Sequence, residues 1–336
     1  GAGIGRACAV ALAEAGAHVI VSDIDGSSAK ETAEMIVSKG GSARSEQQDV
    51  CIEERWHDIF AGIQSQDGGL DVMVNNAGIA VGVPVTEMTL DEWRGQMAVN
   101  LDGVFMGTKG AILLMAEKGT GSIINISSIA GLVGSPGLSG YCASKGGVRL
   151  FTKAVALEMA EAGLAIRANS VHPGIIDTEI WEKQIANVAL MNPELAEPGA
   201  NQISVETVTA GLVPGGKTGQ PQDIANAVVF LASDASSYMT GSEMVIDHGC
   251  HGVAIFGSTG QAQLISITEK IKLFNQLSTS KYKDKYIIGT GLNSLSETIN
   301  LMSVARSLNF KNFLIMPPAF YKYDDDNVIN FYTKII

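Results

Sequence analysis

Short Val- and Ile-rich runs alternate with Ala-rich stretches along residues 1–253, and this alternation is the strongest constraint on the fold. The apolar runs cover residues 18–22, 70–74, 122–126 and 165–171. The stretches between them, such as 6–15 and 150–162, place apolar residues at i, i+3 and i+4, as an amphipathic helix does. Strands that are apolar on both faces and alternate with helices predict an α/β fold around a doubly wound parallel sheet.

A glycine-rich turn containing Gly3, Ile4 and Gly5 leads directly into the first helical stretch. The unpaired N–H groups at a helix N-terminus suit a pyrophosphate, although a plain tight turn is the alternative interpretation. Asp23 ends the next strand, where a carboxylate can bind both ribose hydroxyls of an adenosine. Because a carboxylate repels a 2′-phosphate, the sequence favours NAD over NADP.

A strand precedes this turn in dinucleotide-binding folds, whereas no residue precedes Gly1 here. The absent strand belongs in the middle of the sheet. We therefore expect the sheet to lack its first strand, which leaves the two neighbouring strands without a partner between them.

Tyr141 and Lys145 are four residues apart and lie on one face of a predicted helix. The ordinary pKa of tyrosine is about 10, and an ammonium group one turn away would lower it toward neutral pH. Ser128 follows a buried strand and can direct its hydroxyl at the same carbonyl oxygen, or simply cap a turn. Asn100 is a polar residue in an apolar helical stretch, so it needs a partner or a water.

These residues, together with the segments 75–78, 173–174 and 240–247, occur in the order and spacing of the short-chain dehydrogenase/reductase family. The chain resembles that family over about residues 1–253, and the resemblance implies a Rossmann-like sheet. It also implies that Tyr141 donates and accepts the proton, and that Lys145 tunes the pKa of Tyr141 and binds the nicotinamide ribose. Ser128 would polarise the substrate oxygen, and Asn100 would hold a water in the proton relay.

By the same resemblance, the nicotinamide cofactor has an expected set of ligands. They are Gly3, Ile4, Gly5, Asp23, Asp49, Val50, Asn76, Ala77, Gly78, Tyr141, Lys145, Pro173, Gly174, Ile176 and Thr178. Family likeness further implies a homotetramer.

The expected reaction is an NAD-dependent interconversion of a secondary alcohol and a ketone by hydride transfer, with Tyr141 as acid and base. Apolar residues follow Thr178 where the family has a lid, which suggests an apolar pocket wall or a lid that packs on its own subunit. They are Trp181, Ile185, Val188, Leu190 and Met191. A cyclic alcohol or steroid fits such a wall. A 3-oxoacyl thioester reductase and an inactive chain without cofactor binding are the alternatives.

Composition excludes several other classes of function. The net charge of −12 argues against nucleic acid, and no apolar run reaches the roughly 18 residues of a membrane span. The four cysteines are far apart, which favours free thiols in a reducing, cytoplasmic compartment. The five histidines lack ligand spacing, so we expect no metal, and His172 is expected to be structural.

Residues 254–336 differ in composition, because nine basic and six acidic residues give them a net charge of +3. Strand-like segments at 252–256, 286–289 and 313–316 alternate with helical ones such as 294–308, which predicts part of a (β/α)8 barrel. The motifs 256–260, 289–291 and 317–318 resemble the dihydrodipicolinate synthase/N-acetylneuraminate lyase family. We expect a lyase-like fragment, an incomplete (β/α) barrel. By that likeness Ser258 and Thr259 would meet a carboxylate, and Phe320 or Tyr321 falls near the family's tyrosine.

Overall fold

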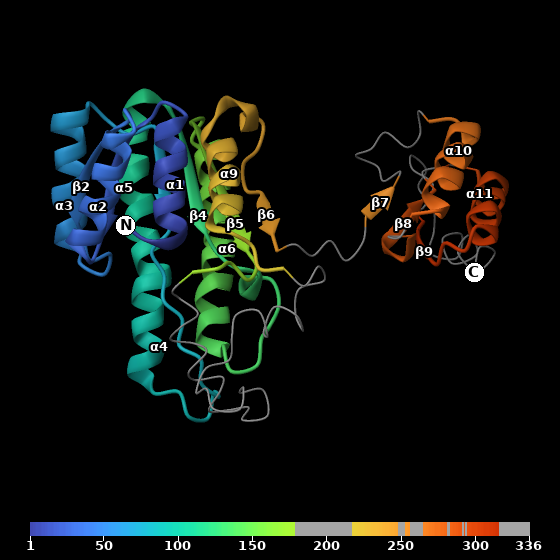
Figure 1. Cartoon of the computed structure of the whole chain (residues 1–336), viewed down its shortest axis with the longest axis horizontal. Helices are drawn as coiled ribbons and strands as arrows, with labels where there is room; N and C mark the ends of the chain where they lie inside the picture. Colours follow the sequence, from blue (N-terminus) through green and yellow to red (C-terminus); the bar gives the residue numbers. More distant parts are fainter. Residues whose placement is uncertain are drawn as a thin grey trace. The chain divides into compact units, whose positions relative to one another are not determined.

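The computed structural model describes residues 1–178, 217–247, 253–255, 265–280, 283–290, 292 and 294–315. The chain divides into two compact units, Gly1–Gly249 and Cys250–Ile336 (Figure 1). The strands of the first unit are β1 (His18–Asp23), β2 (Ser42–Gln47), β3 (Val72–Asn75), β4 (Thr120–Ile126), β5 (Ala165–Pro173) and β6 (Glu243–Ile246). Its α-helices are α1 (Gly3–Glu14), α2 (Gly26–Ser38), α3 (Glu53–Gly62), α4 (Leu90–Met97), α5 (Gly103–Lys118), α6 (Ser139–Glu161) and α9 (Pro221–Ala232). The shorter helical turns are the π-helices η1 (Ile63–Asp67) and η2 (Ala98–Asp102) and the 3-10 helices η3 (Ile129–Gly131) and η5 (Asp234–Ser236).

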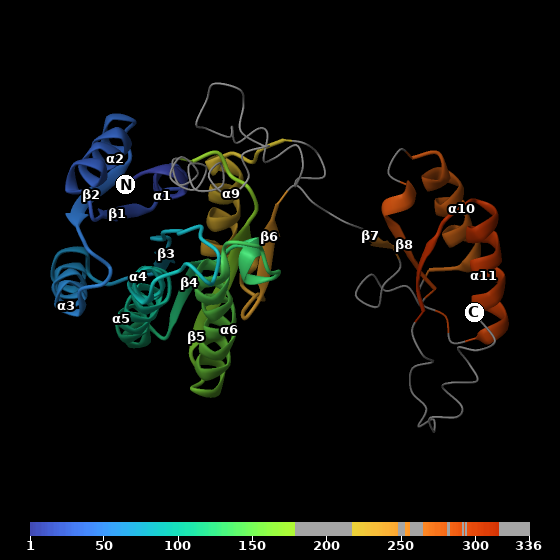
Figure 2. The same cartoon turned by 90° about the horizontal axis from the view of Figure 1, so that it is seen from below.

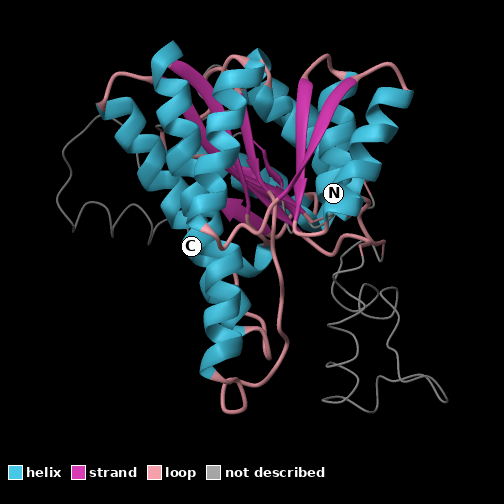
Figure 3. Cartoon of the chain, turned by 90° about the vertical axis from the view of Figure 1, so that its left-hand side faces the viewer, coloured by secondary structure: helices cyan, strands magenta, loops and turns pink. Residues whose placement is uncertain are grey.

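The strands of the first unit are all parallel and form a sheet in two parts (Figure 3). One part is β1 with β2, and the other has the order β3-β4-β5-β6. β1 and β3 are not hydrogen-bonded to each other, so the sheet is divided at the place where the first strand was expected. The expectation of a Rossmann-like sheet that lacks this strand is confirmed.

Helices cover both faces of this sheet, as its apolar strands require (Figure 2). On one face, Cys8 and Ala11 of α1 pack with Ile224 and Val228 of α9 against Ile124 of β4. The small side chains of α1 let the two helices approach closely. This packing places the N-terminus of α1 at the carboxyl ends of the strands.

The opposite face is covered by α3, α5 and α6. Trp56 and Phe60 of α3 stack at 5.6 Å between ring centroids and pack with Met115 of α5 and Val155 of α6. Gly110 of α5 lies directly against the ring of Phe60, where any larger residue would collide. This packing fixes the position of the long helix α6 and therefore of the residues in its first turns.

The strand β2 is absent from the sequence prediction. Its residues are polar and its side chains are mostly half-buried, so no apolar run marks it. It pairs only with β1 and lies at the edge of the sheet, where one-sided burial is sufficient. Arg44 of β2 instead forms ion pairs with Asp67 at 2.7 Å and with Glu46 at 2.6 Å.

The continuous helical segment Leu90–Lys118 is, by length and composition, apolar enough to cross a membrane, and it is the one such helix among the described residues. The sequence analysis expected no membrane-length segment because it looked only for continuous apolar runs, and this helix also contains polar residues. Ala111 and Met115 in its second half are fully buried in the core against the sheet. In this structure one side of the segment packs into the core of the α/β unit and the other side is exposed.

The second unit contains a parallel three-stranded sheet of order β7-β8-β9. Its elements are β7 (Val253–Ile255), α10 (Ile267–Ser278), η8 (Lys283–Lys285), β8 (Tyr286–Gly289), α11 (Leu295–Ser307) and β9 (Asn312–Leu314). Phe274, Ile288, Leu301 and Phe310 form its core. The predicted βα alternation is present, whereas Ser258, Thr259, Phe320 and Tyr321 lie outside the described residues.

Candidate active site

Tyr141, Ser128 and Lys145 come together at the carboxyl ends of β4 and β5. The first turns of α6 carry Tyr141 and Lys145, and the Lys145 Nζ lies 5.9 Å from the centre of the Tyr141 ring. Ser128 follows β4, and its hydroxyl lies close enough to the phenol of Tyr141 to lower the pKa of that group. The three residues predicted from sequence therefore form one cluster.

Burial controls the proton affinities of this cluster. Burial raises the pKa of Tyr141, while the hydrogen bond from Ser128 lowers it in part. Burial lowers the pKa of Lys145 to about 8, and its ammonium donates to the Ile126 carbonyl at 2.9 Å. The sequence argument expected Lys145 to lower the pKa of Tyr141. In this structure the contact that does so comes from Ser128, because Lys145 is engaged with β4.

Asn100 is fully buried in the π-helix η2, and its side chain holds the segment after β3. Its Oδ1 accepts from the Ile79 N–H and its Nδ2 donates to the Ile79 carbonyl, both at 2.8 Å. Nδ2 also donates to Ser144 Oγ at 3.0 Å. Both amide hydrogens are used, so the side chain can offer a relay water only the second lone pair of Oδ1. The relay role stays a prediction.

The segment after β3 approaches this cluster closely at Gly78. A Cβ there would lie 3.2 Å from Lys145 Nζ and 3.4 Å from Asn100 Oδ1, so a larger residue would require the lysine ammonium to shift. Asn76 and Ala77 precede it on the same segment. This close approach supports the expected contact between residues 76–78 and a ribose.

The N-terminus of α1 has the features of an anion site. Ala2 at its N-cap provides no side-chain hydrogen bond, so the first backbone N–H groups of α1 can donate to another acceptor. Gly3 has φ +50°, and a Cβ there would lie 3.4 Å from the Thr178 side chain. A Cβ on Gly5 would lie 2.8 Å from the amide of Asn76. The structure thus brings three of the segments expected to bind the cofactor together around this turn, with Ile4 in the same first turn.

The residues expected near the adenosine lie at the ends of β1 and β2. Asp23 Oδ2 lies 2.9 Å from the Gly1 ammonium group, and Oδ1 accepts from a backbone N–H at 3.0 Å. Asp49 Oδ1 accepts from the Cys51 N–H at 2.9 Å. Val50 packs against Gly103 of α5, where a Cβ would lie 3.0 Å away. All are on the carboxyl edge of the sheet.

The residues expected near the nicotinamide lie at the end of β5 and in the segment that follows it. Pro173 is its last residue, and the Gly174 N–H donates to the Ile246 carbonyl at 2.8 Å. Ile176 is buried and forms an isolated bridge with Gly219. Thr178 is the last described residue of this segment. The expected apolar lid, Trp181, Ile185, Val188, Leu190 and Met191, lies outside the described residues.

Sequence reasoning missed the supporting contacts of this cluster. Ser144 bonds both Asn100 and the Tyr141 carbonyl, the latter at 2.8 Å. Ser127 donates to the Lys145 carbonyl at 2.8 Å. His172 contacts the Ser128 carbonyl at 3.0 Å. The small polar residues beside Ser128 and Tyr141 were visible in the sequence, but only the tertiary structure pairs them.

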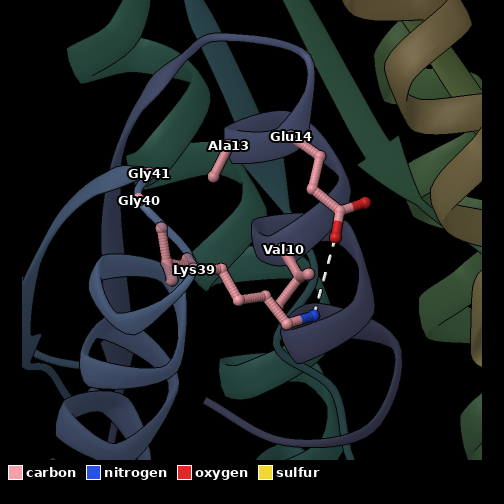
Figure 4. A pocket seen from close by; sticks show the side chains of 7 residues that line it. Val10, Ala13, Glu14, Lys39, Gly40 and Gly41 are labelled. Atoms are coloured by element: carbon pink, nitrogen blue, oxygen red, sulfur yellow. Dashed lines mark ion pairs between the residues drawn. The ribbon is translucent and has the colours of Figure 1, made fainter.

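A pocket of about 300 Å³ lies elsewhere, at the C-terminal end of α1 (Figure 4). The Lys39 ammonium and the Glu14 carboxylate form an ion pair at 3.6 Å across it. Gly40 and Gly41 line it just before β2 begins. It therefore lies at the amino edge of the sheet, opposite the Tyr141 cluster.

Two family models match the chain. Residues 1–251 match a model described as enoyl-(acyl carrier protein) reductase. Residues 233–336 match the model of the dihydrodipicolinate synthetase family.

Individual relatives match the first unit. The NADP-dependent (R)-specific alcohol dehydrogenase of Lentilactobacillus kefiri is 40% identical over 250 residues, which cover 74% of this chain and 92% of the relative. Cyclopentanol dehydrogenase of Comamonas sp. is 38% identical over 251 residues, with coverages of 74% and 92%. The structure of gluconate 5-dehydrogenase from Burkholderia cenocepacia J2315 in complex with NADP and tartrate is 32% identical. It has a TM-score of 0.64 and coverages of 74% and 90%.

Fold, cluster and relatives together define an oxidoreductase that acts on CH–OH groups. The chain belongs to the short-chain dehydrogenase/reductase family.

Proposed function

We propose that this protein interconverts a secondary alcohol and a ketone by NAD-dependent hydride transfer. The observation that carries the proposal is the cluster of the Tyr141 phenol, the neighbouring Ser128 hydroxyl and the buried Lys145 one helical turn away. The position of these groups at the carboxyl edge of the sheet, where ligands bind in such folds, supports proton exchange with an alcohol oxygen.

The residues present fit a nicotinamide dinucleotide. The uncapped N-terminus of α1 suits the pyrophosphate, and the close approach of Gly78 to Lys145 brings the 76–78 segment beside the proposed ribose ligand. Asp23 would hold the adenosine ribose, with Asp49 and Val50 near the adenine. Pro173, Gly174, Ile176 and Thr178 would line the nicotinamide end. When bound, the nicotinamide supplies or accepts the hydride.

The protein's own residues then handle the oxygen and its proton. In the oxidation direction, the ionised Tyr141 removes the hydroxyl proton as the carbon loses a hydride, so a ketone forms. Ser128 donates a hydrogen bond to the substrate oxygen. Lys145 remains bonded to the Ile126 carbonyl at 2.9 Å and would bind the nicotinamide ribose beside the phenol. Reduction reverses these proton movements.

NAD is proposed over NADP because of Asp23. Its carboxylate lies at the end of β1 and would repel a 2′-phosphate. The guanidinium of Arg6, which is near Gly1, is paired with Glu31 at 2.7 Å. The relative from Lentilactobacillus kefiri is NADP-dependent, so this choice needs a direct test.

For the substrate, we propose a small apolar secondary alcohol, such as a cyclic one. The likeness to cyclopentanol dehydrogenase supports this class. The second candidate is a 3-oxoacyl thioester reductase, which the family model described as an acyl carrier protein reductase favours. Turnover of cyclic ketones but not of acyl thioesters would separate the two.

Two further proposals concern the oligomeric state of the enzyme and its location in the cell. Exposed apolar residues on α5 and α6, joined by the edge-to-face pair Phe105 and Phe151, support a homo-oligomer. Cys8, Cys51 and Cys142 are free, which supports a reducing, cytoplasmic location.

The first test of the function is a substitution of Tyr141. Tyr141→Phe removes the proton acceptor and leaves the rest of the cluster, so we expect turnover to fall by about 100-fold or more. NADH binding, followed by nicotinamide fluorescence, should persist. Turnover of the variant at the wild-type rate would refute the assigned role.

A parallel titration of the whole chain with NADH and NADPH tests the inactive-chain alternative. Tighter binding of NADH supports the proposed cofactor. Binding of neither would show that the divided sheet does not support the cofactor, and would favour an inactive chain.

A further inference from the structure

His172 is fully buried near the carboxyl end of β5 and connects that strand to Ser128. Its Nδ1 lies 3.0 Å from the Ser128 carbonyl oxygen, and its Nε2 lies 2.8 Å from Ser170 Oγ. The mechanism above assigns no role to this ring. A buried imidazole with both nitrogens engaged is held in one orientation.

The partners of His172 determine which nitrogen carries the proton. A carbonyl oxygen can only accept, so Nδ1 is protonated and donates to Ser128, while Nε2 accepts from the Ser170 hydroxyl. Burial lowers the pKa of His172, and the nearby cations Arg149 and Lys145 lower it further. The hydrogen bond to Ser128 and the carboxylate of Glu243 act in the opposite direction. The ring therefore remains neutral at pH 7.

Ser128 needs such an anchor because it lies in a turn rather than in a strand. Its backbone is extended, with φ −167° and ψ 161°, and its carbonyl also accepts from the Gly131 N–H at 2.9 Å. Its Oγ accepts from the Ala130 N–H at 3.1 Å. Among the hydrogen bonds of the described residues, His172 is the only side chain that donates to the Ser128 carbonyl.

We propose that His172 is a positioning residue for Ser128. Its Nδ1–H holds the Ser128 peptide so that the serine hydroxyl faces the Tyr141 phenol. The ring thus links the rigid strand β5 to the proton-transfer group through one backbone carbonyl. This inference rests on the proposed function, because the contact matters only if Ser128 and Tyr141 act on a substrate.

Two variants distinguish the loss of the hydrogen bond to Ser128 from a change in the packing of the buried side chain. The side-chain nitrogen of His172→Asn reaches the position of Nδ1, whereas that of His172→Gln reaches the position of Nε2. The Asn variant can therefore keep the bond to Ser128, and the Gln variant loses it. Thermal unfolding of both variants shows whether any loss of function follows from loss of the fold.

We expect His172→Gln to lower kcat by about 10-fold and to raise the pKa of Tyr141, with NADH affinity unchanged. His172→Asn should stay within about threefold of the wild type on both measures. The Tyr141 pKa is read from phenolate absorbance after subtraction of a Tyr141→Phe titration. Equal effects of the two variants, or a larger effect of Asn, would overturn the proposal.

The absorbance titration needs no substrate, so it tests His172 even if the wild type turns over no alcohol. That result would refute the proposed function separately. If the Gln variant does not fold, ¹⁵N spectra of the wild-type imidazole decide the question. A proton on Nδ1, with Nε2 unprotonated near pH 7, supports the proposal, and the opposite tautomer refutes it.

Discussion

The proposed preference for NAD over NADP depends on a single carboxylate, that of Asp23. Its Oδ2 lies 2.9 Å from the Gly1 ammonium group beside the proposed dinucleotide turn. Asp23→Ala removes the ribose ligand and the repulsion of a 2′-phosphate together, so we expect the ratio of NADH to NADPH affinity to fall by about 10-fold or more. Fluorescence titration with each cofactor measures the ratio.

Asp71→Ala serves as the control for this experiment. Asp71 is an exposed carboxylate that pairs with Lys118 at 2.9 Å just before β3, at the opposite edge of the sheet. Its removal changes the net charge by the same amount without touching the site. An unchanged NADH/NADPH ratio in Asp23→Ala, or an equal change in the control, would remove the argument for NAD.

At the scale of elements, Glu243 joins strand β6 to helix α6. Its Oε1 lies 2.7 Å from Arg149 Nε and 2.8 Å from Lys153 Nζ. The hydrogen bond from Arg149 is the main cause that lowers the pKa of Glu243 to about 2, and Lys153 contributes. Glu243→Gln should lower the free energy of unfolding at pH 7 by about 1 to 2 kcal/mol, after screening by solvent.

The pH dependence of this effect has a definite sign. Because the pKa of Glu243 is lower in the folded state, its charge stabilises the fold above the ordinary pKa of 4.5. The contribution disappears as the pH falls from 4.5 toward about 2. Urea unfolding should therefore show a gap between wild type and variant that closes over this window. A gap that persists at pH 2 contradicts the ion-pair explanation.

At the scale of the whole molecule, the apolar residues on α5 and α6 are the basis of the proposed homo-oligomer. Phe105 and Leu113 on α5 and Leu150 and Leu157 on α6 are 48% to 72% exposed. Exposed apolar side chains on neighbouring helices are typical of an interface between subunits. Leu150→Glu with Leu157→Glu should shift the protein to a smaller species in sedimentation experiments, because it would bury charges in that interface.

Ile299→Glu is the matched control for association. Ile299 is 39% exposed and lies on α11 of the second unit, outside the proposed interface. It introduces one such negative charge, against two in the interface variant, into an exposed apolar position. A wild-type protein that sediments as a monomer, or dissociation caused equally by the control, would contradict the proposed interface.

Much of the first unit was predictable because its local patterns are strong. The predicted strands at 18–22 and 122–126 fall within β1 and β4, and the helix at 6–15 corresponds to α1. The polar edge strand β2 was missed, since its burial depends on α2 rather than on an apolar run of its own. In the second unit, the predicted segment 294–308 corresponds to α11.

Residue type and spacing along helices and strands were enough to predict the fold class, the family and the grouping of Tyr141, Ser128 and Lys145. What surrounds each of these groups depends on the tertiary structure. Lys145 donates to β4 while Ser128 lowers the pKa of Tyr141, and His172 contacts the Ser128 carbonyl across 44 residues of chain. Hydrogen bonds and burial between distant segments set pKa values and orientations, and no local pattern encodes them.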